Sequence, residues 1–81
     1  MSQLTQILIV EDDADLRSNL ESLLQDLGHA VVAVGSAEEG LEEVRFRASS
    51  LPFDLVLTDI KLPGISGLEM LRRVRESNPL I

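Results

Sequence analysis

The sequence predicts an α/β fold: a parallel sheet covered by helices, built from three strand–helix units and the start of a fourth strand. Apolar runs of strand length alternate with segments whose apolar residues recur at helical spacing. The strand-like runs are apolar throughout instead of alternating with polar residues, which is typical of parallel strands covered by helices on both faces. These two observations favour a doubly wound sheet.

Composition limits the size and the class of the protein. The chain has 81 residues, a formal net charge of −7, 44% hydrophobic residues and no cysteine, which predicts one small domain without disulfides or thiolate metal sites. Seven Lys and Arg residues are too few for a nucleic-acid-binding face. The apolar runs fall far short of the roughly 20 residues that cross a bilayer, and no signal-peptide pattern opens the chain. We therefore expect a soluble, cytoplasmic protein with no direct nucleic acid or membrane contact.

The first unit consists of a strand at residues 7–10 and a helix after it. Asp13 stands where this helix needs an N-cap, and Asp15 lies in the first turn, where the helix dipole favours negative charge. Gly28 stands where a helix C-terminus favours a left-handed residue. The apolar stripe of this helix is Leu16, Leu20, Leu23, Leu24 and Leu27.

The second unit follows the same plan. Residues 30–34 form a continuous strand-like run, and Ser36 with Glu39 form a capping box that opens a helix. Gly40 inside this helix costs about 1 kcal/mol relative to Ala. The helix is expected to fray near residues 49–52. Its buried stripe is predicted to be Ala37, Leu41 and Val44.

The third unit begins with a strand at residues 53–59, and residues 62–64, Leu-Pro-Gly, predict a type II turn. Ser66 and Glu69 form a second capping box, so a helix starts there. This helix is predicted to place Leu68, Leu71 and Val74 on one side and Arg72, Arg73 and Arg75 largely on the other.

The third helix is predicted to end before Asn78-Pro79, because a residue that precedes Pro avoids the α region. Leu80-Ile81 is expected to begin a fourth strand.

Carboxylates follow two of the predicted strands. Right-handed crossovers place the C-terminal ends of parallel strands at one edge of the sheet, so Glu11, Asp12 and Asp59 are expected to meet there. Solvated strand-end charges are the simpler interpretation. Clustered carboxylates repel one another unless they share a cation, however, and Mg²⁺ is typically held by one or two carboxylates with several waters. The sequence therefore predicts a Mg²⁺ site.

Two segments, ILIVEDDADLR at residues 7–17 and FDLVLTDIKLPGISGLEML at residues 53–71, resemble the receiver domain of bacterial two-component response regulators. The resemblance covers essentially all 81 residues and implies a flavodoxin-like doubly wound sheet in which the strand order is 2-1-3. It also implies that Asp59 is the phosphoacceptor and that Asp12 binds Mg²⁺ directly, while Glu11 acts through water. The backbone carbonyl of Lys61 would supply a further metal ligand.

The same resemblance implies a function and its partners. Receivers take a phosphoryl group from a phosphohistidine of a sensor histidine kinase or phosphotransfer protein. A member of this family would therefore be a self-phosphorylating phosphoacceptor domain and not a turnover enzyme. Attack by a carboxylate on phosphorus needs an ionised nucleophile and neutralisation of the phosphoryl oxygens, which Mg²⁺ can supply. Arg17 and the residues after it on the first helix are expected to contact the kinase.

Two features of the receiver pattern would lie beyond Ile81: a Ser or Thr after a fourth strand, and a Lys after a fifth. Residues 1–81 are therefore expected to be a receiver domain that is incomplete at its C-terminus. One alternative is a truncated interaction module that forms a homodimer through the open edge of the third strand. The other is an aspartyl-phosphatase-type hydrolase, which would need an Asp where Lys61 stands.

Overall fold

The structure is a computed structural model, and it describes residues 5–47, 52–59 and 61–77. The predicted fourth strand at residues 80–81 and the predicted stop before residues 78–79 lie outside the described residues, as does most of the predicted fraying region. Strands and helices alternate along the chain as predicted, in the order β1, α1, β2, α2, β3, α3.

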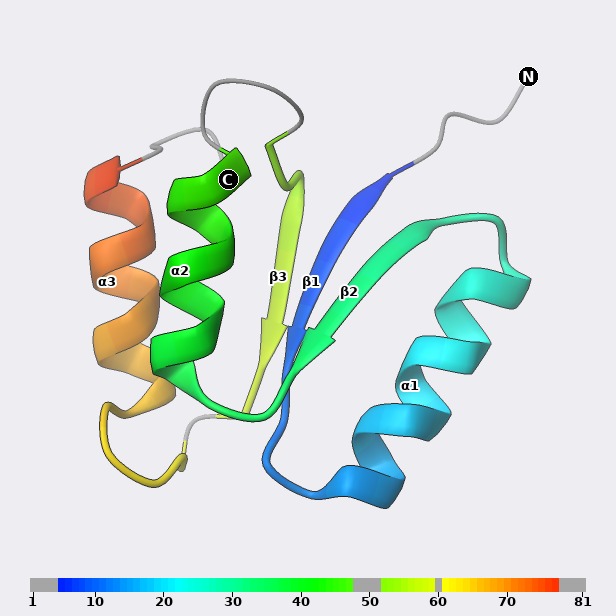
Figure 1. Ribbon diagram of the computed structural model, residues 1–81, viewed down its shortest axis with the longest axis horizontal. Coiled ribbons are helices and arrows are strands. Elements are labelled where there is room, and N and C mark those ends of the chain that lie inside the picture. Colours follow the sequence, from blue (N-terminus) through cyan, green and yellow to red (C-terminus); the bar gives the residue numbers. More distant parts are fainter. Residues whose placement is uncertain (1–4, 48–51, 60, 78–81) are drawn as a thin grey trace.

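The three strands form one parallel sheet in the order β2-β1-β3 (Figure 1). Strand β1 spans Gln6–Val10, β2 spans Ala30–Val34 and β3 spans Leu55–Thr58. The implied strand order 2-1-3 is therefore confirmed. Central strand β1 is buried along its whole length, as a strand between two partners and two helical layers should be.

The third strand is shorter than the predicted range of 53–59. Just before this strand, Asp54 contacts Gln6 twice: its carboxylate accepts a hydrogen bond of 2.8 Å from the backbone N–H of Gln6, and its own N–H donates to the carbonyl of Gln6 at 2.8 Å. The N–H of Gln6 therefore bonds to a side chain and not to a backbone carbonyl. The paired register of β1 and β3 begins one residue later, where Ile7 pairs with Leu55. Phe53 lies outside the strand but is buried in the core.

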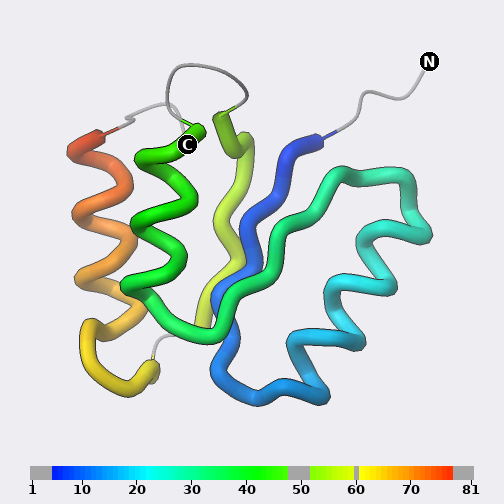
Figure 2. Tube along the Cα trace, viewed as in Figure 1, coloured from blue at the N-terminus to red at the C-terminus, as the bar shows by residue number. Residues whose placement is uncertain are grey.

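The helices lie on both faces of the sheet (Figures 1 and 2). Helix α1 spans Ala14–Asp26 and covers one face, where it packs against β1 and β2. Helices α2, Ala37–Arg47, and α3, Gly67–Ser77, lie side by side on the other face. The predicted α/β layering is therefore confirmed for the described part of the chain.

The helix termini follow the local signals in the sequence. The carboxylate of Asp13 caps α1 by accepting hydrogen bonds from the backbone N–H groups of Asp15 and Leu16, at 3.0 and 3.1 Å. Gly28 and Gly64 have φ angles of 96° and 77°, as predicted for a helix C-terminus and a type II turn. These capping and turn predictions are confirmed.

The two predicted capping boxes differ in detail. The hydroxyl of Ser36 accepts a hydrogen bond of 3.2 Å from the N–H of Glu39. The Glu39 carboxylate accepts one of 3.1 Å from the N–H of Gly35, which is one residue before the N–H of Ser36 that a capping box would use. Ser66 accepts from the N–H of Glu69 at 3.2 Å, but the Glu69 carboxylate bonds to arginines of α3 instead. The second box is therefore only half formed.

The hydrophobic core lies between the sheet and the α2–α3 layer. The predicted stripe of α2 is confirmed, since all three of its residues are buried. The prediction for α3 is partly wrong: Leu68 is 61% exposed, whereas Met70 is fully buried. Helix α3 packs against α2 along the i, i+4 line through Met70 and Val74, which turns Leu68 outward. The buried cluster is Leu8, Val10, Ala37, Leu41, Val44, Phe53, Leu62, Met70 and Val74.

The other face of the sheet is only partly covered, as expected for a receiver domain in which α1 has no companion helix on this face among the described residues. Leucines at three positions of the α1 stripe, Leu16, Leu23 and Leu27, are 46%, 56% and 66% exposed. Leu55 and Leu57 of β3 are exposed as well. Because α1 packs over β1 and β2, no described element covers β3 on this face. Burial on both faces is therefore confirmed for β1, whereas described elements cover β3 on one face only.

Gly40 allows α2 to approach the sheet and α3 closely. A Cβ atom at this position would lie 3.0 Å from Cγ2 of Val10 and 3.3 Å from Sδ of Met70, both of which are fully buried. The sequence presents this glycine only as a cost in helix propensity. The structure shows that the missing side chain is a packing requirement.

We predict that Gly40→Ala destabilises the protein by roughly 1 kcal/mol, although helix propensity alone would stabilise it by a similar amount. Overpacking against the γ-methyl of Val10 outweighs the gain, because Val10 sits in the rigid central strand. Urea denaturation followed by circular dichroism measures the change in the free energy of unfolding. Stabilisation by the variant would contradict the close approach.

The exposed surface of α3 carries an ion-pair network centred on Glu69. Hydrogen bonds from Arg72 first, and from Arg73 second, lower the pKa of the Glu69 carboxyl to about 2. Arg72 also reaches Glu76 at 3.0 Å. A lowered carboxyl pKa adds stability above the ordinary pKa near 4.5 that is lost as the pH falls through about 2. Solvent screening keeps that contribution small.

We predict that Arg72→Gln raises the pKa of Glu69 toward 4.5, because the variant removes the strongest hydrogen bond to the carboxylate. A ¹³C NMR titration of the Glu69 carboxyl carbon measures this pKa directly. The matched control is Arg75→Gln, which removes a charge from the same helix outside the network. An equal shift in both variants would show that general charge, and not the specific pairing, sets the pKa.

Candidate functional site

The carboxylates lie at the C-terminal edge of the sheet, where the chain leaves the paired strands β1 and β3. The backbone N–H of Glu11 donates to the carbonyl of Val34 at 3.0 Å, so the β1–β2 ladder continues one residue beyond the strands. On the other side of β1, the N–H of Asp59 donates to the carbonyl of Val10 at 3.3 Å. Backbone pairing therefore fixes the starting points of both acidic segments.

The predicted convergence of the three carboxylates is observed. Glu11, Asp12 and Asp59 each place one carboxylate oxygen within 4.8 Å of the others. Their environments differ: Glu11 is only 7% exposed, whereas Asp12 and Asp59 are exposed. The cluster thus has one buried member and two that a ligand can reach from solvent.

Backbone N–H groups orient two of these side chains. Oε2 of Glu11 accepts a hydrogen bond of 3.1 Å from the N–H of Asp13, and Oδ1 of Asp59 accepts one of 3.2 Å from the N–H of Lys61. Both bonds span two residues, so each carboxylate is held by its own loop. Among the described residues, Oδ2 of Asp59 has no hydrogen-bond donor, which leaves this oxygen available to react.

The roles predicted for Asp13 and Asp15 are confirmed as structural. Asp13 uses its side chain to cap α1, and Asp15 lies in the first helical turn. Neither belongs to the carboxylate cluster. The structure shows the N–H of Lys61 contacting Asp59, and the use of the Lys61 carbonyl as a metal ligand stays a prediction.

Arg17 makes a contact that the sequence did not predict. Its guanidinium Nη1 donates to the backbone carbonyl of Glu11 at 2.9 Å. The same atom would lie 3.1 Å from a Cβ at Gly35, so Arg17 spans from the first loop to the loop after β2. Arg17 lies one helical turn after the N-cap Asp13. This spacing is the sequence signal that could have predicted a contact between Arg17 and the first loop. Kinase contact by Arg17 stays a prediction.

The donor set suits a hard divalent cation. Three carboxylates supply only oxygen ligands, and two of them remain open to solvent, where Mg²⁺ could keep water ligands. A single shared cation would offset the mutual repulsion of the three charges. Asp12 and Asp59 are thus the accessible carboxylates of the cluster, and Glu11 is the buried, pre-oriented one.

An apolar hollow of about 320 Å³ opens beside the carboxylates. Glu11 and Asp59 form its polar end. Its walls come from β1, β3 and α1, and include Ile9, Leu16, Leu20 and Leu57. The carboxylate cluster is therefore bordered on the α1 side by uncovered apolar surface.

No described helix combines the length with the apolar composition that crossing a bilayer requires.

Comparison with known sequences identifies relatives along nearly the whole chain. The sequence model of the family described as "Response regulator receiver domain" matches residues 7–81. The two-component response regulator PhoP of Pseudomonas aeruginosa is 44% identical over 70 residues, which are 86% of this chain and 29% of that protein. The transcriptional regulatory protein AfsQ1 of Streptomyces coelicolor is 39% identical over 74 residues, 91% of this chain and 31% of that protein. The chain spans about a third of the length of these curated relatives.

Solved structures agree with the sequence relatives. A response regulator receiver domain protein from Clostridium thermocellum superposes with a TM-score of 0.86 at 33% identity, covering 94% of this chain and 59% of that one. The response regulator protein TrrA from Thermotoga maritima, in complex with Mg(2+)-BeF, gives a TM-score of 0.79 at 34% identity, covering 94% and 63%. Taken with the family match over residues 7–81, these similarities show that the chain belongs to the response regulator receiver domain family of two-component systems.

Proposed function

We propose that this chain is the phosphoacceptor of a two-component system and that Asp59 receives the phosphoryl group. The observation that carries the proposal is the convergence of Glu11, Asp12 and Asp59, whose carboxylate oxygens lie within 4.8 Å of one another at the sheet edge. Family membership supports the donor class, a phosphohistidine on a sensor histidine kinase or a phosphotransfer protein. The complex of TrrA with Mg(2+)-BeF supports Mg²⁺ as the cofactor.

Each residue of the site has its own role in the proposed phosphoryl transfer. Oδ2 of Asp59 attacks phosphorus, a P–O bond forms, and the bond from phosphorus to the donor nitrogen breaks in line with it. The N–H of Lys61 holds Oδ1 and so fixes the direction of attack. Mg²⁺, when bound, would neutralise charge on the phosphoryl oxygens and keep the site ionised. Glu11 and Asp12 are the residues that would hold it.

The product is an acyl phosphate that remains attached to the chain, so the domain acts as a signalling module and not as a turnover enzyme. The hydrolase alternative needs a second acid two residues after the nucleophile to protonate a leaving group. Lys61 occupies that position, and it contacts Asp59 through its backbone N–H. The residues around Asp59 therefore favour storage of the phosphoryl group over its rapid hydrolysis.

Replacing Asp12 with Asn is expected to weaken Mg²⁺ binding by about tenfold or more, because a neutral amide oxygen replaces an accessible charged ligand. Isothermal titration calorimetry with Mg²⁺ alone measures the affinity. Asp15→Asn is the matched control, since it makes the same chemical change nearby but outside the carboxylate cluster. Equal affinity in the Asp12→Asn variant and the parent would remove the metal site as described.

We also propose that the exposed edge of β3 can pair with a second copy of this chain. Among the described strands, β3 pairs only with β1, so one row of its backbone groups has no partner strand in the described part of the chain. Leu55 and Leu57 are 49% and 41% exposed, and an apolar hollow borders the strand on each face. Pairing about a two-fold axis would bury this surface.

Sedimentation velocity over a concentration series tests the homodimer. The parent chain is expected to show a rising sedimentation coefficient, and Leu55→Lys is expected to stay monomeric because the charge is unfavourable at a buried edge. Amide hydrogen exchange gives an independent measurement on the same samples. A monomer at every concentration, with β3 amides protected as strongly as those of β1, would contradict the dimer and leave the phosphoacceptor proposal intact.

A further inference from the structure

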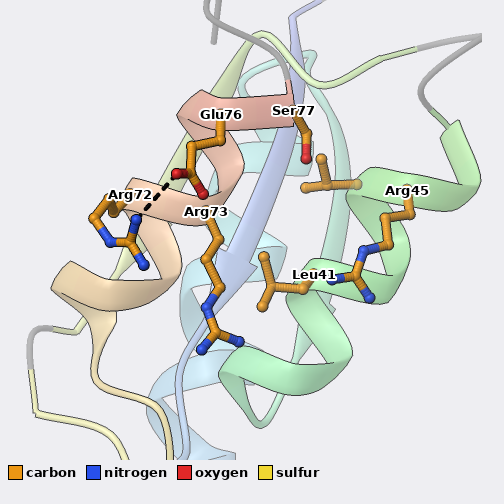
Figure 3. A pocket seen from close by; sticks show the side chains of 7 residues that line it. Leu41, Arg45, Arg72, Arg73, Glu76 and Ser77 are labelled. Atoms are coloured by element: carbon orange, nitrogen blue, oxygen red, sulfur yellow. Dashed lines mark hydrogen bonds and ion pairs between the residues drawn. The ribbon is translucent and has the colours of Figure 1, made fainter.

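A groove lies between α2 and α3, on the side of this helical layer that faces away from the sheet (Figure 3). Its volume is about 360 Å³. Its residues lie in the middle and C-terminal turns of the two helices, whereas the carboxylate cluster lies beyond the C-terminal ends of the strands. The main lining residues are Leu41, Val44, Arg45, Arg72, Arg73 and Glu76.

The groove has an apolar floor flanked by cations. Leu41 and Val44 form the floor and are 6% and 4% exposed. Figure 3 shows the side chains of Arg45 and Arg73 on either side of Leu41, one from each helix. A ligand in this groove would therefore touch aliphatic carbon below and guanidinium groups at both sides.

The three arginines of the groove differ in the ion pairs that they form. Arg72 is bound by Glu69 and Glu76, and Arg73 donates to Glu69 at 2.9 Å. Arg45 makes no ion pair with any described residue. The residues outside the description include no Asp or Glu. The guanidinium of Arg45 is therefore left without an acidic side-chain partner.

The Arg45 guanidinium, which has no acidic side-chain partner and lies next to apolar carbon, favours an anionic ligand. Its planar fork of N–H donors matches the two oxygens of a carboxylate or a phosphate. The chain carries a net charge of −7, so an anion is repelled by most of the surface and attracted to this groove. Glu76 and Glu69 would repel a phosphate dianion more strongly than a single carboxylate, and one carboxylate matches the one groove arginine without an Asp or Glu partner.

We propose that the α2–α3 groove docks an acidic segment of a partner protein, with one Asp or Glu carboxylate held by Arg45 and an apolar neighbour resting on Leu41. Arg73 can assist from the opposite wall while it keeps its bond to Glu69. The site is separate from Asp59, so this inference does not rest on the phosphoacceptor proposal. Either proposal can fail without the other.

The test uses two short peptides and one inorganic ion. ¹H–¹⁵N and methyl NMR spectra of the chain are recorded during titration with acetyl-Leu-Glu-Glu-Leu-amide, then with acetyl-Leu-Gln-Gln-Leu-amide, then with inorganic phosphate. The Glu peptide offers two carboxylates, of which Arg45 is expected to hold one. We expect it to shift the methyl signals of Leu41 and Val44 and the Nε–H signal of Arg45. Binding of the Gln peptide and of phosphate is expected to be at least about fivefold weaker.

Two charge-matched variants complete the test. Arg45→Gln is expected to weaken binding of the Glu peptide about fivefold, whereas Arg75→Gln, an exposed residue of α3 outside the groove, leaves it unchanged. Equal losses in the two variants would mean general charge attraction and would overturn the proposal. So would equal binding of the Gln peptide or of phosphate, or an absence of shifts at Leu41.

Discussion

Replacing Asp59 with Asn is expected to abolish phosphorylation of this protein. An amide oxygen lacks the charge that makes the carboxylate a nucleophile, and neither Glu11 nor Asp12 can substitute, because we assign both to the metal. The measurement is incorporation of acid-stable, base-labile phosphoryl label from acetyl phosphate in the presence of Mg²⁺.

The matched control for this variant is Asp26→Asn, the same chemical change at an exposed position in the last turn of α1. Its labelling should equal that of the parent chain. Label retained by the Asp59→Asn variant would mean that another side chain is the acceptor.

Leu8→Ala is expected to lower the free energy of unfolding by about 3 kcal/mol, because it leaves a cavity at the centre of the core. Leu8 is fully buried in the middle of β1, within the cluster that joins the sheet to α2 and α3. A small domain has only about 5 kcal/mol or somewhat more in total, so the variant should be largely unfolded at modest urea concentrations.

Urea denaturation followed by circular dichroism measures the loss. Leu23→Ala is the control, because Leu23 is 56% exposed on α1 and should change stability by less than about 1 kcal/mol. Equal losses in the two variants would place the core on the α1 side of the sheet and contradict the packing described here.

Local signals predicted much of the fold because they act through neighbouring residues. Asp13 caps α1, Gly28 adopts the left-handed φ that ends the helical segment, and β2 covers the predicted residues 30–34. The stripe of α2 was predictable too, since a helix between a sheet and another helix buries one continuous face.

Features that depend on tertiary packing were not predictable from one sequence. Met70 and Leu68 are both apolar and both on α3, and only the position of α2 determines which of them is buried. Gly40 looks unfavourable until Val10 and Met70 are placed against it. The leucines of α1 form a regular stripe, but periodicity alone does not say how much of that stripe a neighbour covers.

The candidate site was largely predictable because parallel strands bring their C-terminal ends to one edge. Asp59 lies nearly fifty residues after Glu11 and Asp12 in the chain, yet the three carboxylates meet as that rule requires. The burial of Glu11, the contact from Arg17 and the bond from Lys61 to Asp59 depend on loop conformation, which the strand and helix patterns do not determine.

Asp59, within this carboxylate cluster, is proposed to accept a phosphoryl group with the help of Mg²⁺. Borohydride reduction after treatment with acetyl phosphate converts an aspartyl phosphate to homoserine, which tandem mass spectrometry locates in the sequence. We expect homoserine at position 59 alone, formed with Mg²⁺ present and nearly absent when EDTA removes the metal. Homoserine at another acidic position, or equal yields with and without Mg²⁺, would contradict the account.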